Sequence, residues 1–379
     1  MLFALGASLC VILALHPFAL YPLSLLLAPR RTTPRVARPR DQRPPVAVCM
    51  SAFNEERVIV AKVEGLLAMA AEYGPATIHI YVDGAEDRTV ELLTPYADRV
   101  DLVVSAERRG KTAGLNLLVQ RSGGALLAFT DANVVTPVDG LVRLAETFED
   151  PSVGCATARL SYSNPDETGM SFAGALYWRV EEAIKRLESE TVGVLGVDGA
   201  FFMMAREAYE PAPDHLIDDL YVSLCVLAQG LRVVSVDEVE VFERNATRAT
   251  EEFKRKARIA CQAFNVHRAL WPRLRRLPPL TLYGYISHRL LKWLMPFTLA
   301  LAGIFTIAAL GQWLGLGLAL LLVALAAGAL GLAAVVGLKP ARLLLSVATS
   351  FAGVGLGVLQ SYGGRSTYTV WTPAASIRE

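Results

Sequence analysis

The sequence predicts an α/β domain with a mostly parallel sheet, flanked by transmembrane α-helices. Three observations predict this class. Short apolar runs alternate with helical patterns through the centre of the chain, a polar cluster follows each run, and both ends are long and uncharged. Strand, helix and strand at this spacing are typical of a doubly wound sheet.

The central segment contains four predicted strands, at residues 46–50, 78–82, 101–104 and 125–130. Helical patterns follow the first two strands, up to residue 71 and over residues 89–96. The run 125–130 is short and wholly apolar apart from its last residue, so it predicts a buried parallel strand that carries Asp131 at its carboxyl end. Ligands bind at that edge of open α/β sheets.

The two ends of the chain predict membrane spans. The composition is 53% apolar and 19% charged, which is too apolar for an ordinary soluble protein. Residues 2–28 carry no charge and are long enough to cross a bilayer; residues 293–338 are long enough for two spans, and residues 343–364 give a third candidate. The amino end lacks the basic start of a signal peptide, so residues 2–28 predict a retained anchor.

Basic residues follow the first apolar stretch and precede the second, which places the central domain in the cytoplasm. A fourth full span would then leave the tail outside. We divide the chain into an anchor (1–29), a basic linker (30–44), an α/β domain (45–250), basic juxtamembrane helices (251–288), about three transmembrane helices (289–362) and a tail (363–379). The five cysteines show no paired spacing, so we expect reduced, buried thiols and no cysteine metal site.

Four polar clusters follow strands: Asn54-Glu55-Glu56, Asp83-Gly84, Arg108 to Lys111, and Asp131-Ala-Asn133. Each alone is explained by a helix cap, a turn or a solvated basic loop. All four at one sheet edge instead favour a nucleotide site. There Asp83 would accept hydrogen bonds from a base, Lys111 would meet diphosphate charge, and Asp131 would hold Mg²⁺.

These motifs resemble family 2 glycosyltransferases, membrane-associated enzymes with the Rossmann-like GT-A fold. Residues 51–56 resemble their P-x-Y-N-E-E turn with Ser51 and Phe53 substituted, residues 83–89 their D-G-S-x-D-x-T element, and residues 110–116 their G-K-x-x-A-L-N element. Asp131-Ala-Asn133 stands at the D-x-D motif with Asn as the second residue. Residues 196–200 resemble the acceptor-side strand, and residues 217–220 the E-D motif.

The resemblance implies roles for individual residues. Asp219 is the implied general base, beside Asp218, although an acidic pair is also ordinary at the start of a helix. The implied metal is Mg²⁺ or Mn²⁺, held by Asp131 and Asn133. Asp198 and Gly199 fall on the acceptor side. The implied donor-binding residues are Phe53, Asn54, Glu55, Asp83, Lys111, Asp131, Arg255 and Arg258.

The Q-x-x-R-W motif of the processive members is absent, and the basic segment 251–258 stands in its place. That segment could bring Arg255 or Arg258 to the diphosphate, or could lie on anionic lipid. The missing motif argues against processive polymerisation. Single transfer to a lipid-linked acceptor, or work with partner subunits, remains open.

The sequence thus predicts a membrane-bound inverting glycosyltransferase that takes a sugar from a nucleotide-sugar, with a UDP-sugar as first choice. The expected acceptor is a cell-envelope glycan or a lipid-linked molecule in polysaccharide biosynthesis, at the cytoplasmic face of a bacterial inner membrane. Expected partners are membrane lipid and subunits for export, but no nucleic acid. Alternatives are sugar transfer to polyprenyl phosphate, a non-catalytic nucleotide-sugar-binding scaffold, and a nucleotidyltransferase, whose glycine-rich loop residues 51–56 lack.

Overall fold

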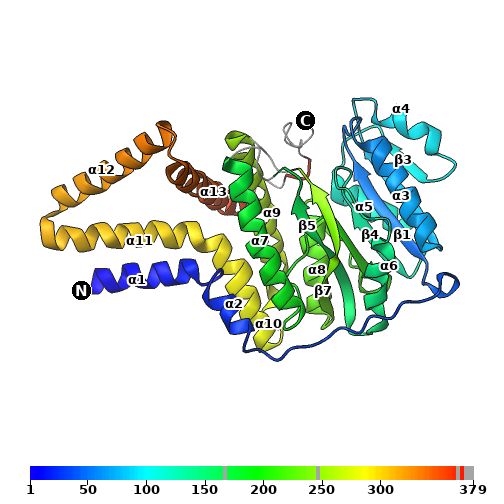
Figure 1. Ribbon diagram of the computed structural model, residues 1–379, viewed down its shortest axis with the longest axis horizontal. Coiled ribbons are helices and arrows are strands. Elements are labelled where there is room, and N and C mark those ends of the chain that lie inside the picture. Colours follow the sequence, from blue (N-terminus) through cyan, green and yellow to red (C-terminus); the bar gives the residue numbers. More distant parts are fainter. Residues whose placement is uncertain (165–168, 245–247, 364–367, 371–379) are drawn as a thin grey trace.

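The computed structural model describes residues 1–164, 169–244, 248–363 and 368–370. A seven-stranded sheet forms the centre of one domain, and long helices extend away from that domain (Figure 1). The strand order is β3-β2-β1-β4-β6-β5-β7. The strands are β1 (Val46–Ala52), β2 (Ala76–Asp83), β3 (Asp101–Ser105), β4 (Leu126–Thr130), β5 (Val153–Tyr162), β6 (Phe201–Ala205) and β7 (Arg232–Glu243).

The four strands predicted from the sequence are confirmed as β1 to β4, which pair in parallel. β6 runs antiparallel to β4 and β5, so the sheet is mixed. The strand expected at residues 196–200 is wrong: these residues form a loop, and β6 begins at Phe201. Gly196 has a φ of +114°, a left-handed conformation that does not fit an extended strand.

Helices cover both faces of the sheet, and alternation along β1 explains why. Val46, Val48 and Met50 point to the face covered by α3 and α6, whereas Ala47 and Cys49 point to the face covered by α5 and α8. The helices of this domain are α3 (Ile59–Tyr73), α4 (Thr89–Leu93), α5 (Lys111–Arg121), α6 (Gly140–Ala145), α7 (Gly169–Ser189), α8 (Asp218–Ala228) and α9 (Ala249–Leu274); η1 (Arg40–Gln42), η2 (Thr94–Tyr96), η3 (Glu146–Glu149) and η4 (Arg206–Ala208) are single 3₁₀ turns.

The apolar ends of the chain lie side by side. The amino-terminal stretch is two helices rather than one, α1 (Leu2–Leu15) and α2 (Leu20–Leu25), and Phe3 of α1 stacks on Phe305 with ring centroids 6.3 Å apart. The remaining elements are α10 (Pro279–Gly284), the π-helical η5 (Tyr285–Leu290), α11 (Leu291–Leu314), α12 (Leu316–Val335) and α13 (Lys339–Tyr362). In the described part of the chain, three helical stretches are long and apolar enough to cross a membrane, within residues 279–314, 316–335 and 339–362.

The last helix, α13, returns the chain to the sheet-containing domain, where it ends beside α9 (Figure 1). Glycines permit the close approach: a Cβ on Gly353 would lie 3.0 Å from the carbonyl oxygen of Phe253. Beyond α13, the side-chain amide of Gln262 donates to the carbonyl of Tyr368 at 3.3 Å. Residues 368–370 therefore lie beside the sheet-containing domain, and the expectation that the tail lies on the opposite side of the membrane is wrong for them. The rest of the predicted tail, except residue 363, falls outside the described residues.

Candidate active site

A cavity of about 1020 Å³ opens at the carboxyl ends of β1, β2 and β4 and continues between the helices as far as α13. It brings together nearly all the residues predicted from the sequence. Asn54 is the exception, because it is not part of the cavity wall. The predicted residues that line the cavity are Phe53, Glu55, Asp83, Lys111, Asp131, Asn133, Asp198, Gly199, Asp218, Asp219, Arg255 and Arg258.

The turn after β1 is fastened to the loop after β2. Asn54 has a φ of 51°, and its side-chain oxygen accepts a hydrogen bond from the backbone N–H of Glu86 at 2.8 Å. The backbone N–H of Glu55 donates to the Thr89 hydroxyl at 2.8 Å. These bonds give Asn54 a structural role in shaping the rim of the cavity.

One end of the cavity is built around Asp83. Its carboxylate accepts hydrogen bonds from the backbone N–H of Arg109 at 2.7 Å and of Gly110 at 3.1 Å. Nearby, the guanidinium of Arg108 lies 3.4 Å from the ring centroid of Phe53. Aromatic and guanidinium planes both stack on nucleic-acid bases, so this corner is suited to a planar heterocycle.

Three charged side chains meet around Gly199 at the centre of the cavity. A Cβ on Gly199 would lie 2.8 Å from Lys111 Nζ and 3.2 Å from carboxylate oxygens of both Asp131 and Asp219. Lys111 Nζ also contacts Asp131 at 2.7 Å and Asp218 at 3.7 Å. Because position 199 has no side chain, these groups can share one small volume.

Burial and crowding shift the pKa values of this cluster. Burial, and then the neighbouring Asp218 carboxylate, raise the pKa of Asp219 to about 7. Burial likewise raises the pKa of Asp218. Burial alone would lower the pKa of Lys111, but Asp131, Asp218 and Asp219 together raise it, so Lys111 stays cationic. A carboxyl group with a pKa near neutrality is suited to accept a proton at physiological pH.

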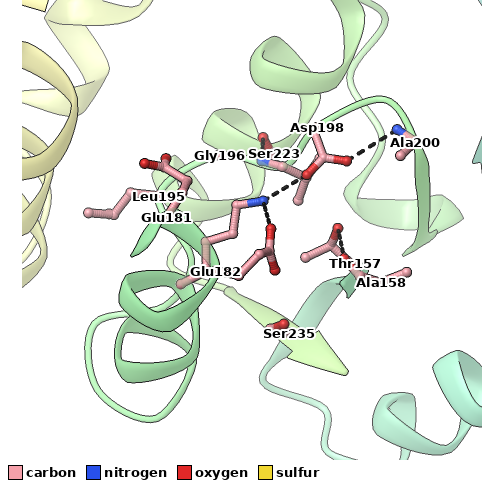
Figure 2. A network of polar contacts seen from close by, with 12 residues as sticks. Thr157, Ala158, Glu181, Glu182, Leu195, Gly196, Asp198, Ala200, Ser223 and Ser235 are labelled. Carbon is pink, nitrogen blue, oxygen red and sulfur yellow. Dashed lines mark hydrogen bonds and ion pairs between the residues drawn. The ribbon is translucent and has the colours of Figure 1, made fainter. Parts of the chain in front are cut away.

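A buried ion triad fixes the loop that carries Asp198. Lys185 of α7 donates to Glu182 at 2.8 Å and to Asp198 at 2.7 Å. Figure 2 shows the Glu182 and Asp198 carboxylates turned toward the same point, with Asp198 also bonded to the backbone of Ala200. From the helical region, Arg289 donates to the carbonyls of Leu195 and Gly196 at 2.6 Å each.

Residues at the end of β7 and on α9 form another wall of the cavity. Asn133 donates its amide to the Glu243 carboxylate at 3.0 Å, and burial raises the pKa of Glu243 to about 7. Arg255 pairs with Glu252 at 2.9 Å. Arg258 bonds Gln262 at 2.9 Å, and burial, followed by Arg255, lowers its pKa to about 10 while Asp219 and Asp131 oppose that shift. The charges of Asp219 and Asp131 therefore stabilise the cationic form of Arg258.

The described residues contain no group of three or more His, Cys, Asp or Glu side chains arranged to enclose a metal ion. The donor set nevertheless suits a hard divalent cation, because Asp131, Asn133 and Glu243 offer oxygen ligands in one wall of the cavity. Mg²⁺ is usually bound by one or two carboxylates together with phosphate oxygens and water.

A model of the family described as glycosyltransferase-like family 2 matches residues 44–262. The chain belongs to glycosyltransferase family 2. It is therefore a glycosyltransferase by family, and the nucleotide-sugar-binding GT-A fold expected from the motifs is confirmed. A solved mannosyltransferase, PcManGT from Pyrobaculum calidifontis in complex with GDP-Man and Mn²⁺, matches with a TM-score of 0.71 at 20% identity, over 96% of this chain and 100% of that chain.

Curated relatives match over a shorter part of the chain. An N-acetylglucosaminyltransferase from Rhizobium leguminosarum bv. viciae is 24% identical over 218 residues, which cover 53% of this chain and 51% of that protein. A beta-monoglucosyldiacylglycerol synthase from Trichormus variabilis is 27% identical over 143 residues, or 35% of this chain and 31% of that protein. The chain thus spans about half the length of the first relative, and less of the second.

Sequence reasoning missed Glu243, Lys185 and Arg289. Glu243 ends a strand whose alternation gives no sign of a ligand, and Lys185 lies on a helix where a lysine normally reads as solvent-exposed. In the sequence, Arg289 is one of the basic residues before the second apolar stretch, which indicate only the membrane orientation. Its bonds to the 195–196 backbone show that the helical region also shapes the active-site loop.

Proposed function

We propose that this glycosyltransferase transfers a sugar from a nucleotide-sugar to a hydroxyl group of a membrane lipid or lipid-linked glycan, with inversion at the anomeric carbon. The observation that carries the proposal is the shape of the cavity. It runs from the polar cluster at Asp83, Lys111 and Asp219 to Ser350, Phe351 and Val354 of α13. A single space therefore joins a nucleotide corner to helices apolar enough to lie in a membrane.

Asp219 is the proposed general base. It takes the proton from the acceptor hydroxyl while the oxygen attacks the anomeric carbon on the face opposite the leaving diphosphate. The bond from sugar to phosphate breaks in the same step, so no covalent sugar–enzyme intermediate is needed. A pKa of about 7 leaves Asp219 ionised in a substantial fraction of molecules at neutral pH.

Lys111 and Arg258 balance the charge that develops on the leaving diphosphate, and both side chains line the cavity. Asp131 and Asn133 would hold Mg²⁺ or Mn²⁺, which supplies Lewis-acid charge to the diphosphate when bound. Phe53 and Asp83 bind the base, and we retain UDP as the first nucleotide to test. The solved mannosyltransferase was captured with a guanine nucleotide-sugar, so GDP-sugars belong in the same panel.

The membrane placement is part of the proposal. Arginines at positions 30, 31, 35, 38, 40 and 43 precede the catalytic domain and favour the cytoplasmic side of a bacterial inner membrane. A hydroxyl acceptor is favoured over polyprenyl phosphate because a phosphate oxygen is already ionised and needs no base, whereas Asp219 is buried and poised to accept a proton. The similarity to a diacylglycerol glycolipid synthase supports a lipid acceptor.

The test measures nucleoside diphosphate release by the full-length protein in proteoliposomes, across UDP- and GDP-sugars with Mn²⁺. Acceptors are a diacylglycerol, a glucosylated diacylglycerol and a polyprenyl phosphate, each in separate vesicles. We expect one donor to be consumed with a hydroxyl lipid, at a rate reduced about 10²-fold or more in Asp219→Asn. Asp139→Asn, the same change at the half-exposed residue that precedes α6, is the control and should retain full activity.

Activity only with polyprenyl phosphate, unaffected by Asp219→Asn, would refute the hydroxyl-acceptor mechanism. Donor binding without release in any vesicle would instead support the non-catalytic scaffold.

A further inference from the structure

We propose that Glu243 serves as the second carboxylate of the divalent-cation site, in place of the acid that Asn133 lacks. The inference rests on the proposed function, because it assumes that a cation holds the donor diphosphate in this cavity. The observation behind it is that a carboxylate from the end of β7 contacts the Asn133 amide directly, 110 residues away in the chain.

The backbone holds Glu243 in this place. Val135 and Phe242 form an antiparallel bridge, with hydrogen bonds of 2.9 Å from Val135 N to Phe242 O and 3.1 Å from Phe242 N to Val135 O. The bridge ties the segment that follows Asp131 to the end of β7. Glu243, the next residue, therefore faces Asn133 as a consequence of strand pairing rather than of a side-chain rotamer alone.

Charge in this wall also favours a cation. Asp131 and Glu243 both line the cavity, whereas Asn133 is neutral. Arg255, which lies nearby on α9, forms its ion pair with Glu252 at 2.9 Å. With only Asp131 and Asn133 as protein ligands, the cation would have one ionised ligand. With Glu243 added it has two, the number typical of a diphosphate-bound Mg²⁺ or Mn²⁺ site.

Besides offering its amide oxygen to the cation, Asn133 holds the Glu243 carboxylate by a hydrogen bond. It uses the amide nitrogen, which cannot bind a cation, and holds the carboxylate that can. The role of the second acid thereby passes from Asn133, which follows β4, to Glu243 at the end of β7.

The test is Mn²⁺ binding to the purified full-length protein, measured from the loss of the free Mn²⁺ electron paramagnetic resonance signal, with UDP and with GDP. Glu243→Gln keeps the shape of the side chain and removes its charge. We expect its Mn²⁺ dissociation constant to rise by about tenfold or more. Glu240→Gln is the matched control: it removes the same charge from the same strand, at a residue that bonds Ser161 and Arg159 outside the cavity wall.

A rescue variant separates ligation from support of the fold. Asn133→Asp restores a carboxylate at the neighbouring position, so adding it to Glu243→Gln should return Mn²⁺ affinity to within a few-fold of the native protein. Unchanged Mn²⁺ binding in Glu243→Gln would overturn the inference while leaving the proposed function standing. A loss that Asn133→Asp does not restore would also overturn it, because Glu243 would then act only by holding the Asn133 segment. If the native protein fails to bind Mn²⁺ both in the presence of UDP and in the presence of GDP, the inference and the proposed function both fail.

Discussion

Lys185→Met tests how strongly the buried ion triad holds the active-site loop. Lys185 is 2% exposed and contacts the Glu182 and Asp198 carboxylates, whose side chains are 10% and 19% exposed, so its removal leaves two largely shielded carboxylates without a counter-ion. Breaking a buried pair in this way costs about 3–5 kcal/mol. At roughly 2–4 °C per kcal/mol for a domain of this size, the melting temperature should fall by about 10 °C.

The loss should depend on pH. Burial raises the pKa of Glu182 to about 7, and Lys185 opposes that shift, so the pKa of Glu182 rises further when Lys185 is removed. A carboxyl group whose pKa is higher in the folded state contributes stability that is fully present below its unfolded pKa. That contribution is lost as the pH rises through the folded pKa. The melting temperature of Lys185→Met should therefore lie closest to the native value at pH 5 and furthest below it at pH 8.

Thermal unfolding in detergent, followed by intrinsic fluorescence at pH 5, 6.5 and 8, measures this effect. Arg186→Met is the matched control, because it removes a positive charge from the adjacent, exposed position of α7. A fall of less than about 2 °C at pH 8, or a fall that is equal at pH 5 and pH 8, would refute the reasoning.

Three further predictions concern the site and the helix contact. Gly199→Ala places a methyl group 2.8 Å from Lys111 Nζ, so donor turnover in steady-state kinetics should fall by about tenfold or more. Its control is Gly65→Ala, which has open space around it and should be neutral or stabilise α3 by up to about 1 kcal/mol in melting curves. The rate of the native enzyme should rise with pH through about 7 as Asp219 loses its proton, and a rate that falls over that range would contradict its role as base. Gly357→Val would place its side chain within 3 Å of Ala260 and separate α13 from α9, so the melting temperature should fall. Gly331→Val, at an open position, is the control, and an equal fall in melting temperature in both variants would exclude the contact between α13 and α9.

The sequence was sufficient for the features that depend on local pattern. The run before Asp131 is a buried strand because its residues are apolar, and Asp83 and Lys111 meet because parallel strands end at one edge. Motif order then connected Asp219 to the same edge, and the structure brings Lys111, Asp131 and Asp219 around Gly199.

Features that depend on tertiary contact could not be predicted in this way. Whether residues 196–200 extend or turn is decided by the bonds from Arg289 and Lys185, which come from two separate helices. The position of α13 follows from its glycine contacts with α9, although its composition alone is that of an ordinary membrane span. The hydrogen bond between Asn133 and Glu243 depends on the bridge between Val135 and Phe242, which cannot be predicted from the local sequence around either residue.

The most direct test of the account is the anomeric configuration of the first product, read from the proton NMR coupling of the transferred sugar. A single displacement with Asp219 as base predicts a configuration opposite to that of the donor, formed without any sugar–enzyme adduct. A product that retains the donor configuration would contradict the mechanism.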